Sequence, residues 1–201
     1  MQYQNLNASD DLKYWEAMIR GDENAFAKLY ELYFKLLYNY GLKICSESTR
    51  VEDCIHDLFV DLWRYRANLS STTSVRFYLY RSLRRKLVKE KENAMWLYDD
   101  ASFVEEVLLL STQSQEHDII ESESKDEKTA KLKRLLNDLS PRQFEALVLY
   151  FYDEFSYEEI AAILNVNEQS ARNLVQRGLT QLRDYAKHIV SIALFLLSPL
   201  F

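Results

Sequence analysis

The stretch FSYEEIAAILNVNEQSARNLVQRGLTQLR, from Phe155 to Arg183, determines the fold expected for the C-terminal part of this chain. It predicts a short helix first, since Ser156 and Glu159 have the spacing of a capping box. Asn165 then suits the left-handed backbone of a tight turn. A longer helix follows from Glu168 onward. Two helices joined by a three-residue turn are typical of a helix-turn-helix.

The second helix of a helix-turn-helix enters the major groove of DNA, where its polar side chains reach base edges and phosphates. We therefore predict DNA contacts for the polar residues in the first turns of this helix, which are Gln169, Ser170, Arg172, Asn173, Gln176 and Arg177. The alternative for the same stretch is an ordinary helical hairpin with a solvated polar face.

The rest of the chain also favours helices. Apolar residues recur at spacings of three and four, and only 3 Gly and 2 Pro interrupt 201 residues. Between residues 99 and 130 this pattern weakens and acidic residues accumulate, as in a linker. We expect an all-α protein with two small helical domains, at residues 1–98 and 131–188, joined by an acidic linker at 99–130 and followed by an apolar tail at 189–201.

The two ends of the chain bear on where the protein works. The 13 residues of the tail are fewer than the roughly 20 that a membrane-spanning helix needs. We expect the last helix to continue past His188, with its apolar surface buried against the C-terminal domain or a partner. The N-terminus lacks the basic and apolar segments of a signal peptide. The chain also has only two cysteines, too few for a secreted domain built on disulfides. Both observations indicate a cytoplasmic protein.

Charge is distributed unevenly along the chain. The net charge of -6 argues against nucleic-acid binding. Residues 76–91, however, contain seven basic residues and one acidic residue, whereas residues 99–127 contain ten acidic residues and one basic residue. Because DNA responds to the local potential, the basic helix can bind it despite the acidic total.

Aromatic residues interleave with the basic residues of 76–91, and the polar loop NLSSTTS, residues 68–74, precedes them. Aromatic rings stack on unpaired bases while neighbouring cations hold phosphates, and the loop offers hydrogen-bond donors and acceptors. This interpretation assigns single-stranded DNA contacts to Asn68, Ser70, Ser71, Thr72, Thr73, Tyr78, Tyr80, Arg81, Arg84 and Arg85. Core packing of the aromatic residues and a plain connecting loop are the alternatives.

A third feature is acidic. Asp53, Asp57 and Asp61 are four residues apart and share one helix face, where like charges repel each other. A basic protein partner would relieve that repulsion, and a solvated face is the alternative.

Patterns of catalytic or metal-binding residues are missing from the sequence. It has no Gly-rich phosphate loop and no His and Cys residues at zinc spacing. Cys45, Cys54 and His56 are close in sequence, but Cys54 falls on the apolar stripe of a helix and is expected to be buried. We expect no enzymatic activity, no cofactor, no metal and no small-molecule substrate.

Three segments together resemble the extracytoplasmic-function branch of the sigma-70 family of bacterial RNA polymerase sigma factors. VEDCIHDLFVDLWRYR, residues 51–66, is similar to the region that docks on the polymerase clamp. SVRFYLYRSLRRKLVKE, residues 74–90, is similar to the region that melts and reads the minus-ten element. The stretch from Leu139 to Arg183 is similar to the region that reads the minus-thirty-five element.

The resemblance implies a role for each predicted site. Asp53, Asp57 and Asp61 would bind core RNA polymerase. The loop and the basic helix would capture and melt the minus-ten element, and the last helix would grip the minus-thirty-five element. The implied partners are core RNA polymerase, promoter DNA and an anti-sigma factor.

The chain departs from the family pattern at three places. Tyr78-Leu79 stands where the family often has Trp-Leu, and Arg84-Arg85 stands where it often has Arg-Asn. Asn165 occupies a turn position where Gly is common. Two other functions remain as alternatives: a helix-turn-helix regulator that acts without direct polymerase binding, and a membrane-associated interaction protein built around the apolar tail.

Overall fold

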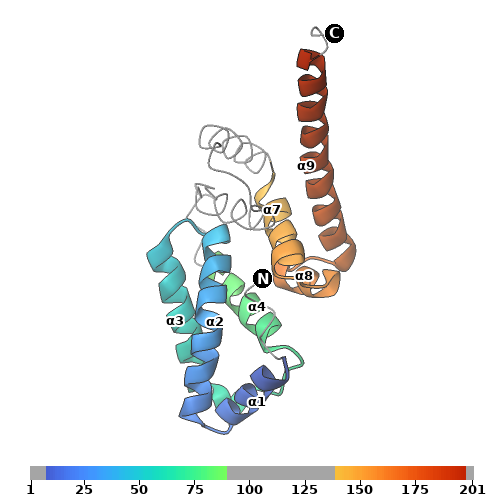
Figure 1. Cartoon of the computed structure of the whole chain (residues 1–201). Coiled ribbons are helices and arrows are strands. Elements are labelled where there is room, and N and C mark those ends of the chain that lie inside the picture. Colours follow the sequence, from blue (N-terminus) through green and yellow to red (C-terminus); the bar gives the residue numbers. More distant parts are fainter. Residues whose placement is uncertain (1–7, 90–138, 198–201) are drawn as a thin grey trace. The chain divides into compact units, whose positions relative to one another are not determined.

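The computed structural model describes the backbone of residues 8–89 and 139–197, and side chains within 10–88 and 139–183 (Figure 1). The chain divides into two compact units, Met1–Leu97 and Tyr98–Phe201. The described residues form helices and connecting turns without a strand, so the predicted all-α class is confirmed.

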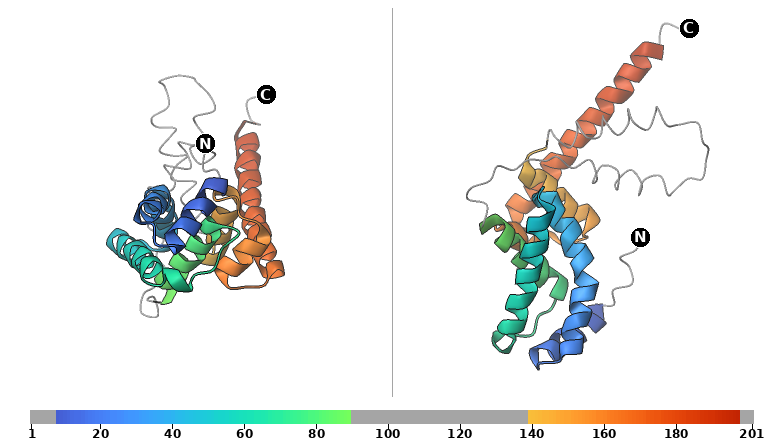
Figure 2. Two further views of the ribbon diagram at one scale, coloured as in Figure 1. Left: turned by 90° about the horizontal axis from the view of Figure 1, so that it is seen from below. Right: turned by 90° about the vertical axis from the view of Figure 1, so that its left-hand side faces the viewer.

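Within residues 8–89, the N-terminal unit contains four α-helices, which are α1 (Ala8–Ile19), α2 (Glu23–Ile44), α3 (Ser48–Arg64) and α4 (Val75–Lys89), and a 3-10 turn at Arg66–Asn68. Helix α2 contacts the other three, and both views of Figure 2 show α2 and α3 running side by side. Gly21 joins α1 to α2 with a φ of 96°, a left-handed conformation that glycine adopts without steric cost. Asp22 then caps α2, because its side chain accepts hydrogen bonds from the backbone N–H groups of Asn24 and Ala25.

The core of this unit is rich in aromatic residues. Its largest fully buried side chains include Trp15, Tyr33, Tyr40 and Tyr80. Gly41 lets α2 approach α3 closely, since a Cβ at that position would lie 2.4 Å from Cγ1 of Val51. Both cysteines are free thiols in the same interior, with Cys45 5% and Cys54 2% exposed.

One buried carboxyl group ties α1 to α2. Asp11 is 7% exposed, and the hydroxyl of Tyr33 donates a hydrogen bond to it. Burial raises the pKa of Asp11 above its ordinary value, while the Tyr33 hydrogen bond acts in the opposite direction. Burial also raises the pKa of Tyr33, so its hydroxyl stays protonated and donates.

The C-terminal unit contains α7 (Pro141–Leu147), a π-helical turn at Val148–Tyr152, α8 (Tyr157–Leu164) and α9 (Glu168–Leu197). Capping boxes begin α7 at Ser140 and α8 at Ser156, the second as the sequence predicts. Asn165 ends α8 in the left-handed conformation, with φ 55° and ψ 53°.

The packing of this unit depends on α7 and α9. A Cβ on Gly178 would lie 2.7 Å from Cδ1 of Leu147, so glycine sets how closely the two helices approach. Helix α9 continues to Leu197, which confirms that the helix extends past His188. The side chains from position 184 onward are outside the described residues, and so is the burial predicted for the tail.

The π-helical turn changes which side chains face the core. Regular α-helical spacing from Phe144 would place Phe151 on the apolar face, but Phe151 is 57% exposed. A π-turn holds more residues than an α-turn, which rotates Phe151 away from the apolar face.

Candidate nucleic-acid interface

The loop before α4 is fixed by hydrogen bonds at several points. Ser74 caps the helix by accepting from the backbone N–H of Phe77 at 3.2 Å. The hydroxyl of Thr72 donates to the Ser74 carbonyl and accepts from the Ser74 N–H, both at 3.2 Å. The indole N–H of Trp15 donates to the Ser70 carbonyl at 3.2 Å. Thr72 therefore shapes the loop, while the side chains of Ser71 and Thr73 are exposed.

A pocket of about 210 Å³ lies between α3, this loop and α4. Leucines and two tyrosines supply apolar and aromatic walls, and charged groups line the remainder. Its lining residues are Leu58, Asp61, Leu62, Tyr65, Leu69, Tyr78, Ser82, Arg85 and Lys86. Rings beside hydrogen-bonding groups are what a protein uses to hold an unstacked base.

Most of the predicted minus-ten residues lie either in this pocket or on the surface around it. Tyr78 and Arg85 line the pocket, and Asn68, Ser71, Thr73 and Arg81 are exposed around the loop and α4. Sequence reasoning missed Tyr65, Ser82 and Lys86, because only the packing of α3 against α4 brings them to the pocket.

Two residues expected at this surface lie in the interior. Tyr80 is fully buried, with its ring 4.7 Å from that of Tyr40, so it offers no stacking face. Arg84 is 8% exposed, which removes it from the residues that can reach a phosphate at the surface. Both positions follow from helical geometry, because one face of α4 packs against the core and only the residues on its other face can reach solvent.

The acidic face on α3 is only partly free. Asp53 and Asp57 are exposed, whereas Asp61 forms an ion pair with Lys86 of α4 at 2.5 Å. Val60 is 52% exposed on the same helix. Exposed charges and one exposed apolar side chain therefore share this helix, a combination that a solvated surface also shows.

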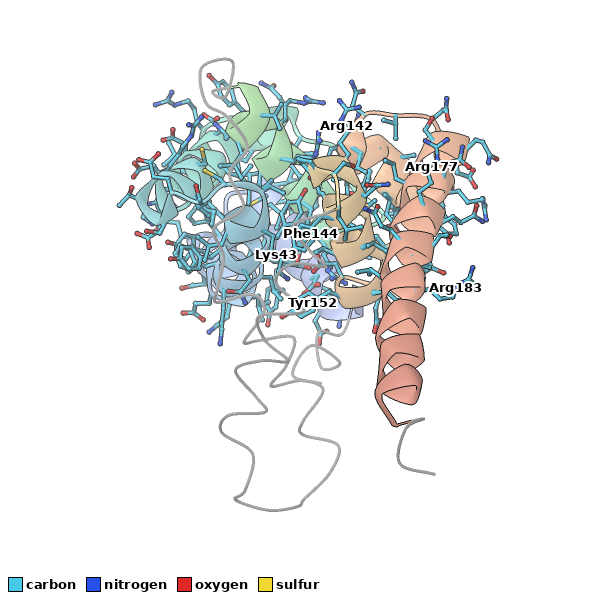
Figure 3. The ribbon with its side chains drawn as sticks, turned by 90° about the horizontal axis from the view of Figure 1, so that it is seen from above. Lys43, Arg142, Phe144, Tyr152, Arg177 and Arg183 are labelled. Atoms are coloured by element: carbon cyan, nitrogen blue, oxygen red, sulfur yellow. The ribbon has the colours of Figure 1, made fainter. Side chains whose placement is uncertain are left out.

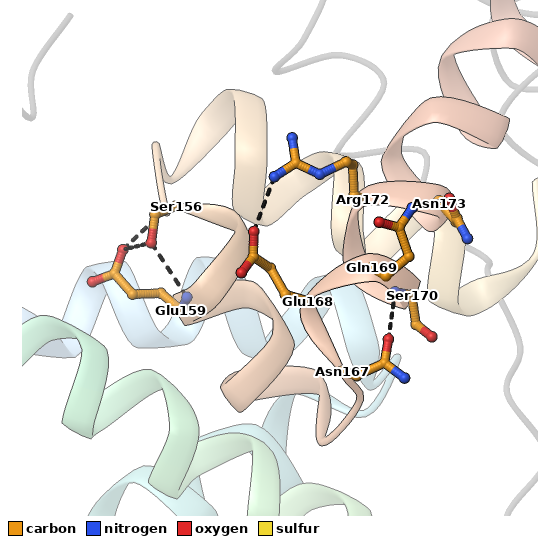
Figure 4. Close-up of polar contacts among 8 residues, drawn as sticks. All are labelled: Ser156, Glu159, Asn167, Glu168, Gln169, Ser170, Arg172 and Asn173. Atoms are coloured by element: carbon orange, nitrogen blue, oxygen red, sulfur yellow. Dashed lines mark hydrogen bonds and ion pairs between the residues drawn. The ribbon is translucent and has the colours of Figure 1, made fainter.

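Polar contacts order the start of α9 (Figure 4). Arg172 pairs with Glu168 at 2.9 Å, and its guanidinium lies 4.3 Å from the centre of the Tyr157 ring. Gln169 donates to the side-chain oxygen of Asn173 at 3.1 Å. Of these side chains, Arg172 is thus the one that both an ion pair and a ring hold in place.

Tyr157, whose ring contacts Arg172, is itself held in place by Tyr150. A hydrogen bond with Tyr150 raises the pKa of Tyr157, and burial raises it further. The two rings are stacked 4.8 Å apart. Tyr157 therefore stays neutral and presents a ring face to the guanidinium.

The side of α9 beyond its first turn forms an open groove of about 610 Å³ with the start of α7. Amide, hydroxyl and guanidinium groups line it, namely Gln143, Asn173, Gln176, Arg177, Thr180 and Gln181. Figure 3 shows Arg142 at the start of α7, and Arg177 and Arg183 on α9. Gln143 and Thr180 had no sequence signal, because they join the groove only when α7 packs on α9.

The structure also bears on the metal and membrane questions. His56 shares a hydrogen bond with the hydroxyl of Tyr30 at 2.9 Å, and Cys54 is buried. No group of three or more potential metal ligands occurs among the residues described. None of the described helices has the length and apolarity that a membrane crossing requires.

Known proteins resemble both units. The family described as Sigma-70 region 2 matches residues 29–96, and Sigma-70, region 4 matches residues 129–182. The ECF RNA polymerase sigma factor SigE of Mycolicibacterium smegmatis (strain ATCC 700084 / mc(2)155) is 45% identical over 60 residues, which are 29% of this chain and 23% of that protein. The match thus spans about a quarter of the curated relative's length.

Two solved structures share the fold at 18% sequence identity. CnrH in complex with the cytosolic domain of CnrY matches with a TM-score of 0.61, over 89% of this chain and 98% of that one. The sigma factor RpoE in complex with the anti-sigma factor NepR, from Bartonella quintana, matches with a TM-score of 0.54, over 81% and 96%. With region 2 and region 4 in order along more than half of its length, the chain belongs to the sigma-70 family.

Proposed function

We propose that this chain binds core RNA polymerase, directs it to promoters and melts the DNA there. The observation that carries the proposal is the pocket between α3 and α4, which combines Tyr78 with the cations Arg85 and Lys86. A regulator that binds only duplex DNA has no use for a site suited to an unstacked base. The role is non-catalytic and needs no cofactor, and the cytoplasm is where core polymerase and promoter DNA are found.

The N-terminal unit, which we assign to residues 1–98, takes the minus-ten element. A base that leaves the stack costs a few kcal/mol, which the pocket offsets by stacking and hydrogen bonds. Asn68, Ser71 and Thr73 have exposed side chains beside it. Arg81 and Arg85 are exposed on α4 and hold the neighbouring phosphates.

The C-terminal helix-turn-helix, assigned to residues 131–188, grips the minus-thirty-five element through the start of α9. Gln169 and Asn173 form an amide pair, and paired donors and acceptors suit base edges. Gln176 and Arg177 are exposed in the groove with α7. The linker at 99–130 joins the two domains and lies outside the described residues.

The surface of α3 binds the polymerase. Asp53 and Asp57 supply exposed negative charge, and Val60 supplies apolar contact area beside them. Asp61 contributes less, because Lys86 already neutralises it. An anti-sigma factor is the further partner we propose, since the RpoE structure that shares this fold holds one.

The test is the affinity of the full chain for core RNA polymerase without DNA. We expect the double variant Asp53→Asn and Asp57→Asn to associate more slowly and with a weaker dependence on salt, as loss of charge at the rim of an interface does. Keeping Asp61 preserves its ion pair with Lys86, so stability should not change.

The matched control is the double variant Glu16→Gln and Glu23→Gln, which removes two exposed charges of the same unit from α1 and α2 and leaves those of α3 in place. Equal association rates for both double variants would contradict the assignment of α3 to polymerase binding. A wild-type chain that binds no core polymerase would instead favour the regulator.

A further inference from the structure

Helix α1 reaches the pocket through one buried side chain. Trp15 is 1% exposed, and its indole N–H donates to the carbonyl of Ser70, in the middle of the loop before α4. The two residues are 55 positions apart in sequence. A backbone carbonyl of the loop is thus held by a helix that supplies no lining residue of the pocket.

The same indole ring also contacts the aromatic wall of the pocket. The ring centres of Trp15 and Tyr78 are 4.9 Å apart and their planes meet at 60°, an edge-to-face contact. Tyr78 lines the pocket and is half-buried. One side chain of α1 therefore fixes both the loop backbone and the ring that would stack on a base.

The other hydrogen bonds of the loop lie toward its ends. Leu69 donates its N–H to the Arg66 carbonyl at 3.1 Å, and Thr72 and Ser74 hold the segment that enters α4. The contact at Ser70 falls between these two anchors. Without it, the residues on either side of Ser70 would have more conformations to lose when a base binds.

We infer that Trp15 is a positioning residue for base recognition, which holds the Ser70 carbonyl and Tyr78 so that the pocket exists before DNA arrives. The inference rests on the proposed minus-ten function of the pocket. Trp15 touches no base itself. Its effect is on preference among bases, because preorganised groups discriminate better than mobile ones.

The test uses the full chain assembled with core RNA polymerase and a short randomised library of single-stranded DNA. Enrichment of each base at each position measures base preference. Trp15→Phe removes the N–H donor and keeps an aromatic ring. A second variant carries benzothienylalanine at position 15, which keeps the volume of tryptophan and lacks only the donor, so a folding defect in the first leaves the question answerable.

The matched control is Tyr33→Phe, which removes the hydrogen bond that ties α2 to α1 through Asp11 and leaves the Trp15 donor in place. We expect both position-15 variants to lose roughly fivefold in base discrimination, the change that one lost hydrogen bond brings. Overall DNA affinity should change less, because phosphate contacts supply most of it. Tyr33→Phe should keep the wild-type preference even where thermal unfolding shows that it is equally destabilised.

Wild-type preference in the benzothienylalanine chain would overturn the inference and leave the proposed function intact. An equal loss of preference in Tyr33→Phe would also overturn it, since the effect would then follow the stability of α1. A wild-type chain that enriches no base would instead refute the proposed capture of the minus-ten element.

Discussion

At the scale of single residues, Asp11 has surroundings unlike those of a free side chain. It is a carboxyl group inside an aromatic core, and burial raises its pKa more than the hydrogen bond from Tyr33 lowers it. The neighbouring charge of Asp10 raises it further. An acid with a raised pKa favours the folded state when it is protonated, so its contribution to stability falls as the pH rises above its ordinary value of 3.8.

We therefore expect Asp11→Asn to stabilise the N-terminal unit at neutral pH relative to wild type. Asn keeps an oxygen for the Tyr33 hydroxyl and carries no charge that burial would penalise. The difference in the free energy of unfolding should shrink as the pH is lowered toward 3.8, where the aspartate becomes protonated. Thermal unfolding followed by circular dichroism, as a function of pH, measures it.

Glu16→Gln is the control, since Glu16 is exposed on the same helix. The free energy of unfolding of Glu16→Gln should differ from that of wild type by the same amount at every pH. A difference between Asp11→Asn and wild type that grows toward low pH would show that the carboxylate is instead stabilised by folding.

At the scale of elements, the start of α9 separates two kinds of side chain. Arg172 is held by Glu168 and by the Tyr157 ring, so reading a base would require it to give up both contacts. Asn173 and Arg177 lie in the groove between α7 and α9. Arg172 is therefore less available for reading a base than the side-chain amide of Asn173 beside it.

This arrangement predicts different losses for three alanine variants. Asn173→Ala should relax the preference at one position of the upstream element by about 1–3 kcal/mol, the value of a side chain that reads a base edge. Arg177→Ala should weaken binding evenly across sequences and reduce the salt dependence by about one counterion, as loss of a phosphate contact does. Arg172→Ala should change preference less than Asn173→Ala does.

Binding of the full chain with core polymerase to a library of upstream elements, at several salt concentrations, distinguishes the three variants. A uniform loss in Asn173→Ala, or a loss confined to one position in Arg177→Ala, would reverse these assignments.

The same elements show how far sequence reasoning extends. Asp22, the capping box at Ser156 and the left-handed Asn165 were all predictable, because each depends on neighbours within a few residues. Phe151 was not, since a π-helical turn shifts the helical register there. The pocket was only partly predictable, because Tyr65 and Lys86 reach it through the packing of α3 against α4.

At the scale of the whole molecule, each of the two units encloses its own buried residues. In the N-terminal unit these come from α1 to α4, and in the C-terminal unit from residue 139 to α9. Each unit also has one glycine at a close helix crossing, Gly41 against Val51 and Gly178 against Leu147. The chain therefore offers a matched pair of positions at which one core can be disturbed at a time.

The buried thiols of the N-terminal unit allow the effects of substitutions at Gly41 and Gly178 to be compared. Cys45 and Cys54 are the chain's 2 cysteines, and both lie in the N-terminal core. A thiol-specific reagent can modify them only when that unit opens. The labelling rate therefore measures how often the N-terminal unit opens and does not report on the C-terminal unit. Gly41→Ala overpacks the crossing by about 1–3 kcal/mol, and should speed labelling about tenfold, whereas Gly178→Ala should leave it unchanged. If both variants speed labelling equally, the two cores open together, and the chain unfolds as one cooperative unit.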